Sequence, residues 1–187
     1  MKIELSANLI PDSRLKDEIW NLMKKISTKY GTCHDIKKKF GAHITVVGFE
    51  NIDEKNLQKI VNEIKLICSK TKPFEVKIGK INFAENNRQK YQTQYVIYLE
   101  VIRSSVLSKL NKILNNKIKK YGKPKLRYFV PHVTLAHGDL NKENYYRAKR
   151  ELEAVILRKF IARSLKIMIL KEPKKWVHVK TFKFAAY

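Results

Sequence analysis

Two short segments of the sequence carry a histidine and a threonine that are separated by one apolar residue and followed by another. The first segment is HITV, beginning at His43, and the second is HVTL, beginning at His132, 89 residues later. Alternate side chains of a β-strand lie on one face of the sheet. In a strand, His43 would therefore lie beside Thr45, and His132 beside Thr134, while the apolar residues anchor each strand in the core.

These residue types are suited to displacement at phosphorus. Such a reaction needs a base that takes a proton from the attacking oxygen and an acid that protonates the departing oxygen. Histidine can play either part near neutral pH, because its unperturbed pKa is about 6.5. Threonine hydroxyls and one positively charged imidazole can stabilise the phosphate oxygens in the transition state. We therefore predict a metal-independent phosphodiesterase with His43, Thr45, His132 and Thr134 as catalytic residues.

Two other interpretations compete with this one. A single His-x-Thr segment in a strand is most often structural, but two copies at equivalent places of a repeated element order favour a shared site. A zinc site is the second alternative. Catalytic zinc takes three protein ligands, and no third ligand is spaced near either segment: His137 lies five residues after His132 and would face away from it in a regular strand. The sequence therefore predicts no metal site.

The elements that must position the two segments follow the same order twice. Period-2 alternation predicts strands, and apolar residues three or four positions apart predict helices. In the first half, strands are predicted over 2–9, 42–49 and 74–83, with helices from Pro11 to Gly31 and from Asp53 onward. In the second half, strands are predicted over 93–101, 128–136, 162–170 and 176–184, with helices after Ser104 or Ser105 and from Asn141 through Ile156.

This order predicts an α+β fold with two pseudo-symmetric β-α-β-α-β lobes, over residues 1–88 and 89–187, in a single domain. Their mainly antiparallel sheets would face a central cleft, a usual place for a binding site. The length of 187 residues suits one such domain. The sequence shows no export signal and no apolar run long enough for a membrane span. We therefore expect an intracellular protein, cytoplasmic or nuclear, that is monomeric and needs no obligatory protein partner.

The net charge of +23 is the strongest compositional signal. Six cations are concentrated between Lys117 and Arg127, where they would attract polyphosphates and nucleic acid. Only 8 of the 40 basic residues are arginine, a bias that an AT-rich genome also produces, so charge alone leaves the partner open. The alternative to an enzyme is a non-catalytic basic RNA-binding module.

Aromatic and basic residues outside the two segments are further candidates for substrate contacts. Tyr128 and Trp176 could stack on a base. Tyr128 and Phe129 are adjacent and point to opposite faces in a strand, so only one of the two can face a cleft. Lys125 and Arg127 could contact a phosphate.

The paired segments resemble the His-x-Thr-x motifs of the 2H phosphoesterase superfamily, which includes 2′,5′-RNA ligase-like proteins, cyclic phosphodiesterases and 2′,5′-oligoadenylate phosphodiesterases. The stretches HITVVGF from His43 and PHVTLAHG from Pro131 are similar to that family's pattern, and the resemblance covers essentially the whole chain. It implies that the two histidines form the catalytic pair, that Thr45 and Thr134 hold the phosphate, and that no metal or organic cofactor is needed. It also implies an RNA or nucleotide substrate, with opening of 2′,3′-cyclic phosphates or cleavage or formation of 2′,5′-phosphodiester bonds as the reactions.

Overall fold

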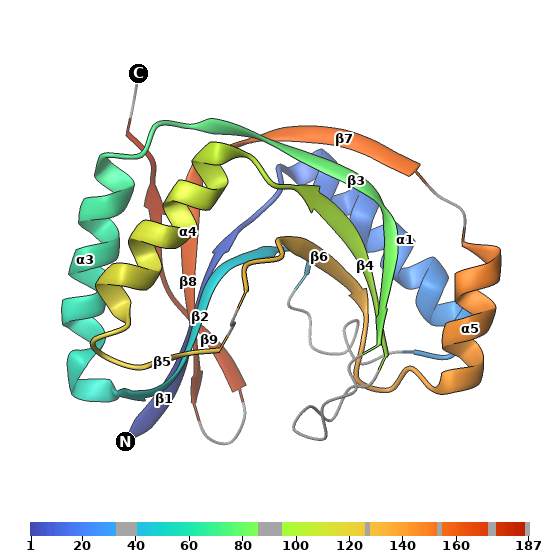
Figure 1. The fold of residues 1–187 in the computed structure, drawn as a ribbon, viewed down its shortest axis with the longest axis horizontal. Helices are drawn as coiled ribbons and strands as arrows, with labels where there is room; N and C mark the ends of the chain where they lie inside the picture. Colours follow the sequence, from blue (N-terminus) through green and yellow to red (C-terminus); the bar gives the residue numbers. More distant parts are fainter. Residues whose placement is uncertain (33–40, 86–94, 126–127, 153–154, 172–174, 186–187) are drawn as a thin grey trace.

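The computed structural model describes residues 1–32, 41–85, 95–125, 128–152, 155–171 and 175–185. These residues form two curved antiparallel sheets that are flanked by helices (Figure 1). The first, sheet A, has the strand order β5-β2-β1-β8-β9, and the second, sheet B, has the order β6-β4-β3-β7. Strands β2 and β6 lie next to each other, so the two sheets meet at these strands.

The bounds of the elements follow the sequence patterns closely. Sheet A consists of β1 (Lys2–Leu9), β2 (Ile44–Asp53), β5 (Lys123–Pro124), β8 (Ser164–Lys171) and β9 (Lys175–Lys183). Sheet B consists of β3 (Phe74–Glu85), β4 (Tyr95–Ile102), β6 (His132–Ala136) and β7 (Val155–Ala162). The helices are α1 (Ser13–Tyr30), α3 (Leu57–Ser69), α4 (Ser105–Ile118) and α5 (Lys142–Glu151), with a short 3-10 helix η1 (Glu54–Asn56) before α3.

The ends of the helices are set by local sequence. Asp12 begins α1 by accepting the backbone N–H of Leu15 at 2.9 Å, and Ser104 and Asn141 cap α4 and α5 in the same way. Gly31 ends α1 with a φ of 67°, a left-handed conformation that glycine adopts without strain. The predicted starts of these three helices are confirmed.

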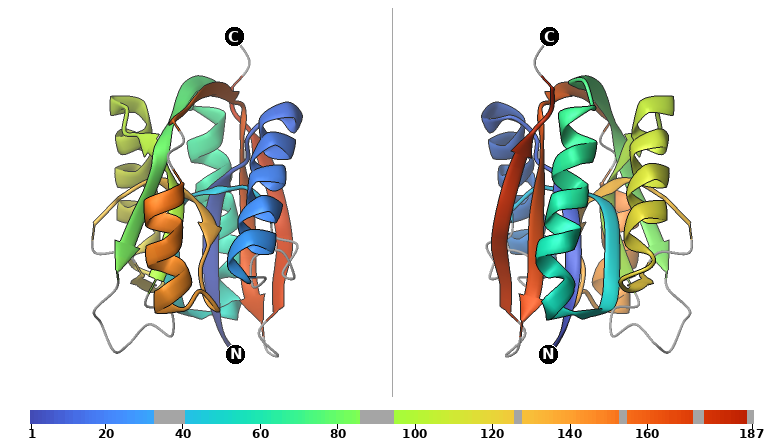
Figure 2. Two further views of the ribbon diagram at one scale, coloured as in Figure 1. Left: turned by 90° about the vertical axis from the view of Figure 1, so that its right-hand side faces the viewer. Right: turned by 90° about the vertical axis from the view of Figure 1, so that its left-hand side faces the viewer.

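Two of the helices pack against one sheet although the strand that precedes each of them belongs to the other sheet. Helix α1 follows β1 of sheet A but contacts β6 and α5, whereas α4 follows β4 of sheet B but contacts β2 and α3. Figure 2 shows α5 nearest the viewer in one view and α3 in the other, so the two helix pairs lie on opposite sides of the molecule. This exchange joins the two sheets into one body.

The halves of the sequence also exchange strands. β3 of the first half pairs with β4, and β8 of the second half pairs with β1. The order β2-β1-β8-β9 in sheet A corresponds to β6-β4-β3-β7 in sheet B. The predicted fold class, α+β with pseudo-symmetric antiparallel sheets, is confirmed, but the boundary between the sheets does not coincide with the expected lobe boundary near residue 88.

The segment after Asn141 differs from the prediction. Helix α5 ends at Glu151, and Val155 and Ile156, which we expected in the helix, belong to β7. β-Branched residues such as valine and isoleucine favour strands. Pairing with β3 gives the backbone of this segment its hydrogen-bond partners. Strand β6 also begins later than expected, at His132, because the preceding proline has no N–H to donate to a ladder.

The core is one cluster of buried apolar side chains, to which every strand of the described ranges except the short, exposed β5 contributes. In β1 the residues on this face are at most 2% exposed: Ile3, Leu5, Ala7 and Leu9. The intervening positions of β1 are polar, so the opposite face of sheet A is polar along its central strand. No helix in the described ranges is long and apolar enough to cross a membrane.

Candidate active site

The two His-x-Thr segments lie on β2 and β6, the strands at which the sheets meet. His43 immediately precedes β2, and His132 is the first residue of β6. The side chains of both histidines and of Thr45 and Thr134 are half-buried, so each keeps some access to solvent. The structure therefore brings both predicted segments to equivalent ends of neighbouring strands.

Both strands carry a β-bulge directly after the threonine. The extra residue is Val46 in β2 and Leu135 in β6, the fourth residue of the motif in each case. A bulge bends the strand and changes the direction of the side chains beside it. The side chain of Asn111 in α4 donates a hydrogen bond of 2.7 Å to the carbonyl of Val46, which holds the first bulge. The matching bulges extend the symmetry of the two segments from sequence to backbone geometry.

Both imidazoles are oriented by the same kind of hydrogen bond. His43 Nδ1 lies 3.0 Å from the carbonyl oxygen of Gly41, and His132 Nδ1 lies 2.8 Å from that of Val130. Because a carbonyl can only accept, Nδ1 carries a proton in each ring, and Nε2 is the nitrogen that can exchange a proton with a substrate. Gly41 has a φ of 70°, which is the left-handed region that favours glycine.

Each threonine faces a polar residue of the neighbouring strand. Asn8 of β1 is directly opposite Thr45, and its Oδ1 accepts the Thr45 hydroxyl at 3.1 Å. Tyr98 of β4 is directly opposite Thr134. Sequence reasoning missed both Asn8 and Tyr98. In the sequence, Asn8 is one of four polar residues that alternate along β1, and Tyr98 is one of two tyrosines in β4, so neither is distinguished by its local pattern. The pairing that brings each of them to a threonine depends on register.

Tyr98 also contacts His132. The centroids of the two rings are 5.4 Å apart and their planes cross at 66°, an edge-to-face contact that restricts the imidazole. Burial raises the pKa of the Tyr98 phenol, and the charge of Glu100 raises this pKa further. The phenol therefore stays protonated, so Tyr98 can both position His132 and donate a hydrogen bond.

The candidate site extends from Thr45 across the polar face of sheet A. Residues that pair across antiparallel strands share a face, so the partners of Thr45 on the next strands lie on this face too. Thr45, Asn8, Lys166 and Thr181 form one row across β2, β1, β8 and β9. Neighbouring strands are about 4.8 Å apart, which places the Cα of Lys166 about 10 Å from that of Thr45. Lys166 is half-buried and has no carboxylate partner among the described residues. Sequence reasoning missed it, since nothing distinguishes it from the many other lysines.

Lys125 and Trp176 also lie on this face, at different distances from Thr45. The Lys125 side chain lies over Gly48, and its Nζ is 2.6 Å from a carboxylate oxygen of Glu4. Trp176 lies on β9, three strands from β2, in the row of Glu4, which is four residues before Asn8 along β1. Standard strand spacing therefore places it roughly 20 Å from Thr45. The structure thus brings Lys125 toward the motif but leaves Trp176 at the far corner of the sheet.

Of the remaining candidates from the sequence, the structure describes Tyr128 and the lysines of the basic cluster. Tyr128 is 70% exposed, and Arg127 lies outside the described residues. Three lysines of the basic cluster, Lys120, Lys123 and Lys125, form ion pairs with glutamates of neighbouring elements. These pairs neutralise part of the cluster, so it attracts polyanions less strongly than its sequence suggests.

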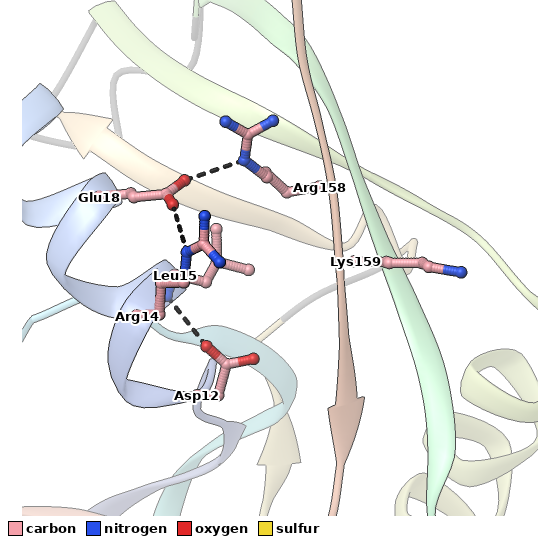
Figure 3. A pocket seen from close by; sticks show the side chains of 6 residues that line it. All are labelled: Asp12, Arg14, Leu15, Glu18, Arg158 and Lys159. Atoms are coloured by element: carbon pink, nitrogen blue, oxygen red, sulfur yellow. Dashed lines mark hydrogen bonds and ion pairs between the residues drawn. The ribbon is translucent and has the colours of Figure 1, made fainter.

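A hollow of about 510 Å³ lies at the start of α1 next to β7 (Figure 3). Its lining consists of Asp12, Arg14, Leu15, Glu18, Arg158 and Lys159. The Glu18 carboxylate accepts hydrogen bonds from Arg158 at 2.9 Å and from Arg14 at 3.3 Å. The hydrogen bond from Arg158 is the main cause that lowers the pKa of Glu18. Lys159 forms an ion pair with Glu75, outside the hollow, and Asp12 caps α1, so the charged groups already have partners. No residue of either motif lines the hollow.

The described ranges contain no group of three His, Cys, Asp or Glu side chains that could hold a metal ion. The motifs offer two imidazoles and two threonine hydroxyls. Only the imidazoles are ligands of the kind that zinc takes, and catalytic zinc needs three such ligands. Cys68 is buried, and burial raises the pKa of its thiol to about 12, so it supplies no thiolate near neutral pH. The metal-free site stays a prediction that removal of metal ions can test.

The chain belongs to the 2′-5′ RNA ligase superfamily. The model of this family matches residues 15–172, a range that includes both His-x-Thr segments. The resemblance to 2H phosphoesterases is thereby confirmed, and membership of the family supports an enzyme with activity of the phosphodiesterase type.

Relatives with similar sequences carry a related name. A protein of Bacillus cereus (strain AH820) that is named "Putative phosphoesterase" is 31% identical over 138 residues, which are 73% of this chain and 70% of the relative. A protein of Bacillus thuringiensis (strain Al Hakam) with the same name is 30% identical over the same shares of the two chains. These relatives agree with the family assignment.

Solved structures share the fold at much lower identity. TT0787 of Thermus thermophilus is similar with a TM-score of 0.71 and 10% identity, and all of both chains is covered. LigT of E. coli, in a crystal structure with 3′-AMP, is similar with a TM-score of 0.69 and 11% identity, again over all of both chains. At such identities the similarity shows the fold alone.

Proposed function

We propose that the protein is a metal-independent phosphodiesterase that acts on RNA ends or nucleotides by two-histidine acid–base catalysis. The reactions are the opening of 2′,3′-cyclic phosphates, or the cleavage or formation of 2′,5′-phosphodiester bonds. One observation carries the proposal: two His-x-Thr segments on adjoining strands have the same bulge and the same Nδ1–carbonyl hydrogen bond. If the two histidines had only structural roles, nothing would require the same bulge and the same hydrogen bond at both of them.

The proposed reaction on a 2′,3′-cyclic phosphate needs only these groups. His132 Nε2 takes a proton from water while the water oxygen bonds to phosphorus. The bond between phosphorus and the 3′-oxygen breaks, and His43 gives its proton to that oxygen. Thr45 and Thr134 donate hydrogen bonds to the phosphate oxygens that carry the charge. The products are a 2′-phosphate and a free 3′-hydroxyl, and exchange with solvent restores the two protonation states.

Formation of a 2′,5′-bond uses the same groups, with the 5′-hydroxyl of an RNA in place of water. The reversal of that step exchanges the roles of the histidines, because the departing oxygen becomes the attacking one. Crystal structures of E. coli LigT with 3′-AMP, NADP+ and ATP support a ligand that contains a nucleotide.

Turnover is expected to survive EDTA, because the proposed acid and base are both imidazoles. The test is a substrate panel with purified protein in EDTA: 2′,3′-cyclic nucleotides, 2′,5′- and 3′,5′-linked dinucleotides, and RNA ended by a cyclic phosphate. Loss of turnover on chelation, with recovery on addition of zinc or manganese, would contradict the metal-free mechanism. Binding of RNA without turnover of any member of the panel would favour the alternative, a non-catalytic RNA-binding module.

Replacement of Lys166 by methionine is expected to raise KM for a cyclic nucleotide several-fold with little change in kcat. Lys166 lies in the row of Thr45 and would attract the phosphate without taking part in proton transfer. The matched control is Lys180→Met, which removes the same charge from exposed β9 on the opposite face of the same sheet, opposite buried Ile167. An equal effect of the two substitutions would show that only total charge matters.

A further inference from the structure

Asn8 lies in the central strand of sheet A and is fully buried. Its Oδ1 lies 2.8 Å from the Ser6 hydroxyl oxygen and 3.1 Å from the Thr45 hydroxyl oxygen, and in this arrangement both hydroxyls donate to it. Its Nδ2 has no hydrogen-bond partner among the described residues. One side of the amide is therefore satisfied twice, while two buried N–H donors on the other side are left without an acceptor.

This arrangement is unfavourable for the amide and for the proposed phosphate site. A buried N–H that lacks an acceptor loses its bond to water without compensation, and such donors are rarer in proteins than carbonyls without a donor. A threonine hydroxyl has one proton. While Thr45 donates that proton to Asn8, it has none to give to a phosphate oxygen.

A half-turn of the amide about its bond to Cβ replaces the two unpaired donors by one carbonyl oxygen without a donor, which is the less costly arrangement, and it also frees the proton of Thr45. Nδ2 then takes the place of Oδ1, at the same distances from Ser6 and Thr45, and its two hydrogens can each bond to one hydroxyl oxygen. The Thr45 hydroxyl becomes an acceptor toward Asn8, and its own proton is released toward the site. A bond from that proton to an anionic phosphate oxygen is charge-assisted and stronger than the neutral bond it replaces.

We propose that Asn8 is the positioning residue of Thr45: when a phosphate is bound, the amide nitrogen of Asn8 faces Thr45 and directs the hydroxyl proton of Thr45 at the phosphate. This inference rests on the proposed function, since it takes Thr45 as a phosphate contact. Thr134 needs no such partner, because its hydroxyl has no hydrogen bond with a described residue that could hold its proton.

The test is the replacement of Asn8 by aspartate, which has nearly the same shape but only accepts when ionised. Both hydroxyl protons must then point at residue 8, so Asn8→Asp is expected to lower kcat/KM about 10- to 100-fold, the range expected for one lost bond to a charged group. Thr45→Val should produce a similar loss, and the double variant should be no worse than Thr45→Val alone. If Asn8→Asp costs as much in the Thr45→Val background as in the wild type, it acts by charge or by misfolding, and the inference is wrong.

Ser6→Ala is the matched control, because it removes the other hydroxyl bound to Asn8 and leaves the contact with Thr45. It is expected to keep turnover within about twofold of wild type, because the bond from Asn8 to Thr45 that directs the hydroxyl proton remains. Thermal unfolding of each variant separates loss of fold from loss of phosphate contact.

The wild-type protein supplies an independent measurement with inorganic phosphate. Side-chain amide protons of Asn8 should show a nuclear Overhauser contact with Thr45 Hβ when phosphate is bound, and their exchange with solvent should be slow. Absence of that contact in phosphate-bound protein overturns the inference whatever the variants do. If the wild type neither turns over any substrate of the panel nor binds phosphate, the proposed function fails instead, and this inference fails with it.

Discussion

Replacement of either His43 or His132 by alanine is expected to lower turnover on the true substrate on the order of 10²–10⁴-fold, as loss of a positioned acid or base does. The two imidazoles act in one step, on the attacking and on the departing oxygen. The double variant should therefore be little slower than the slower single variant, since groups that act as a unit are not additive. Steady-state kinetics of the three variants under the same conditions give the comparison.

The matched control for these variants is His178→Ala. It removes an exposed imidazole of β9, three strands from β2, whose Nε2 lies 3.0 Å from the Thr181 hydroxyl. Its turnover should stay near that of the wild type, and the thermal unfolding of all four proteins should be similar. Near-normal turnover by either the His43 or the His132 variant would refute the two-histidine mechanism.

A substrate with a better leaving group should separate the roles of the two histidines. We expect His43 to act as the acid and His132 as the base, so a nucleotide ester of p-nitrophenol should need little help from His43. On that ester His43→Ala should come within about tenfold of wild type, whereas His132→Ala should remain on the order of 10²–10⁴-fold slower. The measurement is the ratio of kcat/KM between the ester and a cyclic nucleotide for each variant.

The pH profile gives the same assignment independently. The wild-type rate should rise as the base becomes neutral and fall as the acid loses its proton, which produces a bell-shaped curve. With the activated ester, His43→Ala should lose the fall on the alkaline side and keep the rise on the acidic side. If the activated ester restores turnover to His132→Ala and not to His43→Ala, and His132→Ala keeps the alkaline fall but loses the acidic rise, the two roles are the other way round.

The sequence by itself determined the class of fold and predicted the four residues of the candidate site. A histidine and a threonine two positions apart share a face in any strand, so His43 with Thr45, and His132 with Thr134, were paired by local geometry alone. Alternation and helix caps likewise located most elements, because both depend on neighbours within a few residues. The repetition of the segment at equivalent places predicted one shared site, and the resemblance of both segments to the 2H motifs indicated the family.

Only the tertiary structure decided which residues surround these four. Asn8 lies opposite Thr45, Lys166 lies opposite Asn8, and Tyr98 contacts His132, through strand pairings between residues that are far apart in the chain. A shift of one residue in register would turn every one of these side chains to the other face, and no local pattern reports that register.

The same reason explains two of the expectations that changed. Val155 and Ile156 lie in β7 and not in α5, because β3 offers that segment a backbone partner that its own sequence does not reveal. The lysines before the second motif looked like one continuous basic patch until folding placed Glu4, Glu50 and Glu63 beside three of them. Spacing along a chain predicts which groups share a strand face, but charge and hydrogen-bond partners from distant segments are set only when the sheets assemble.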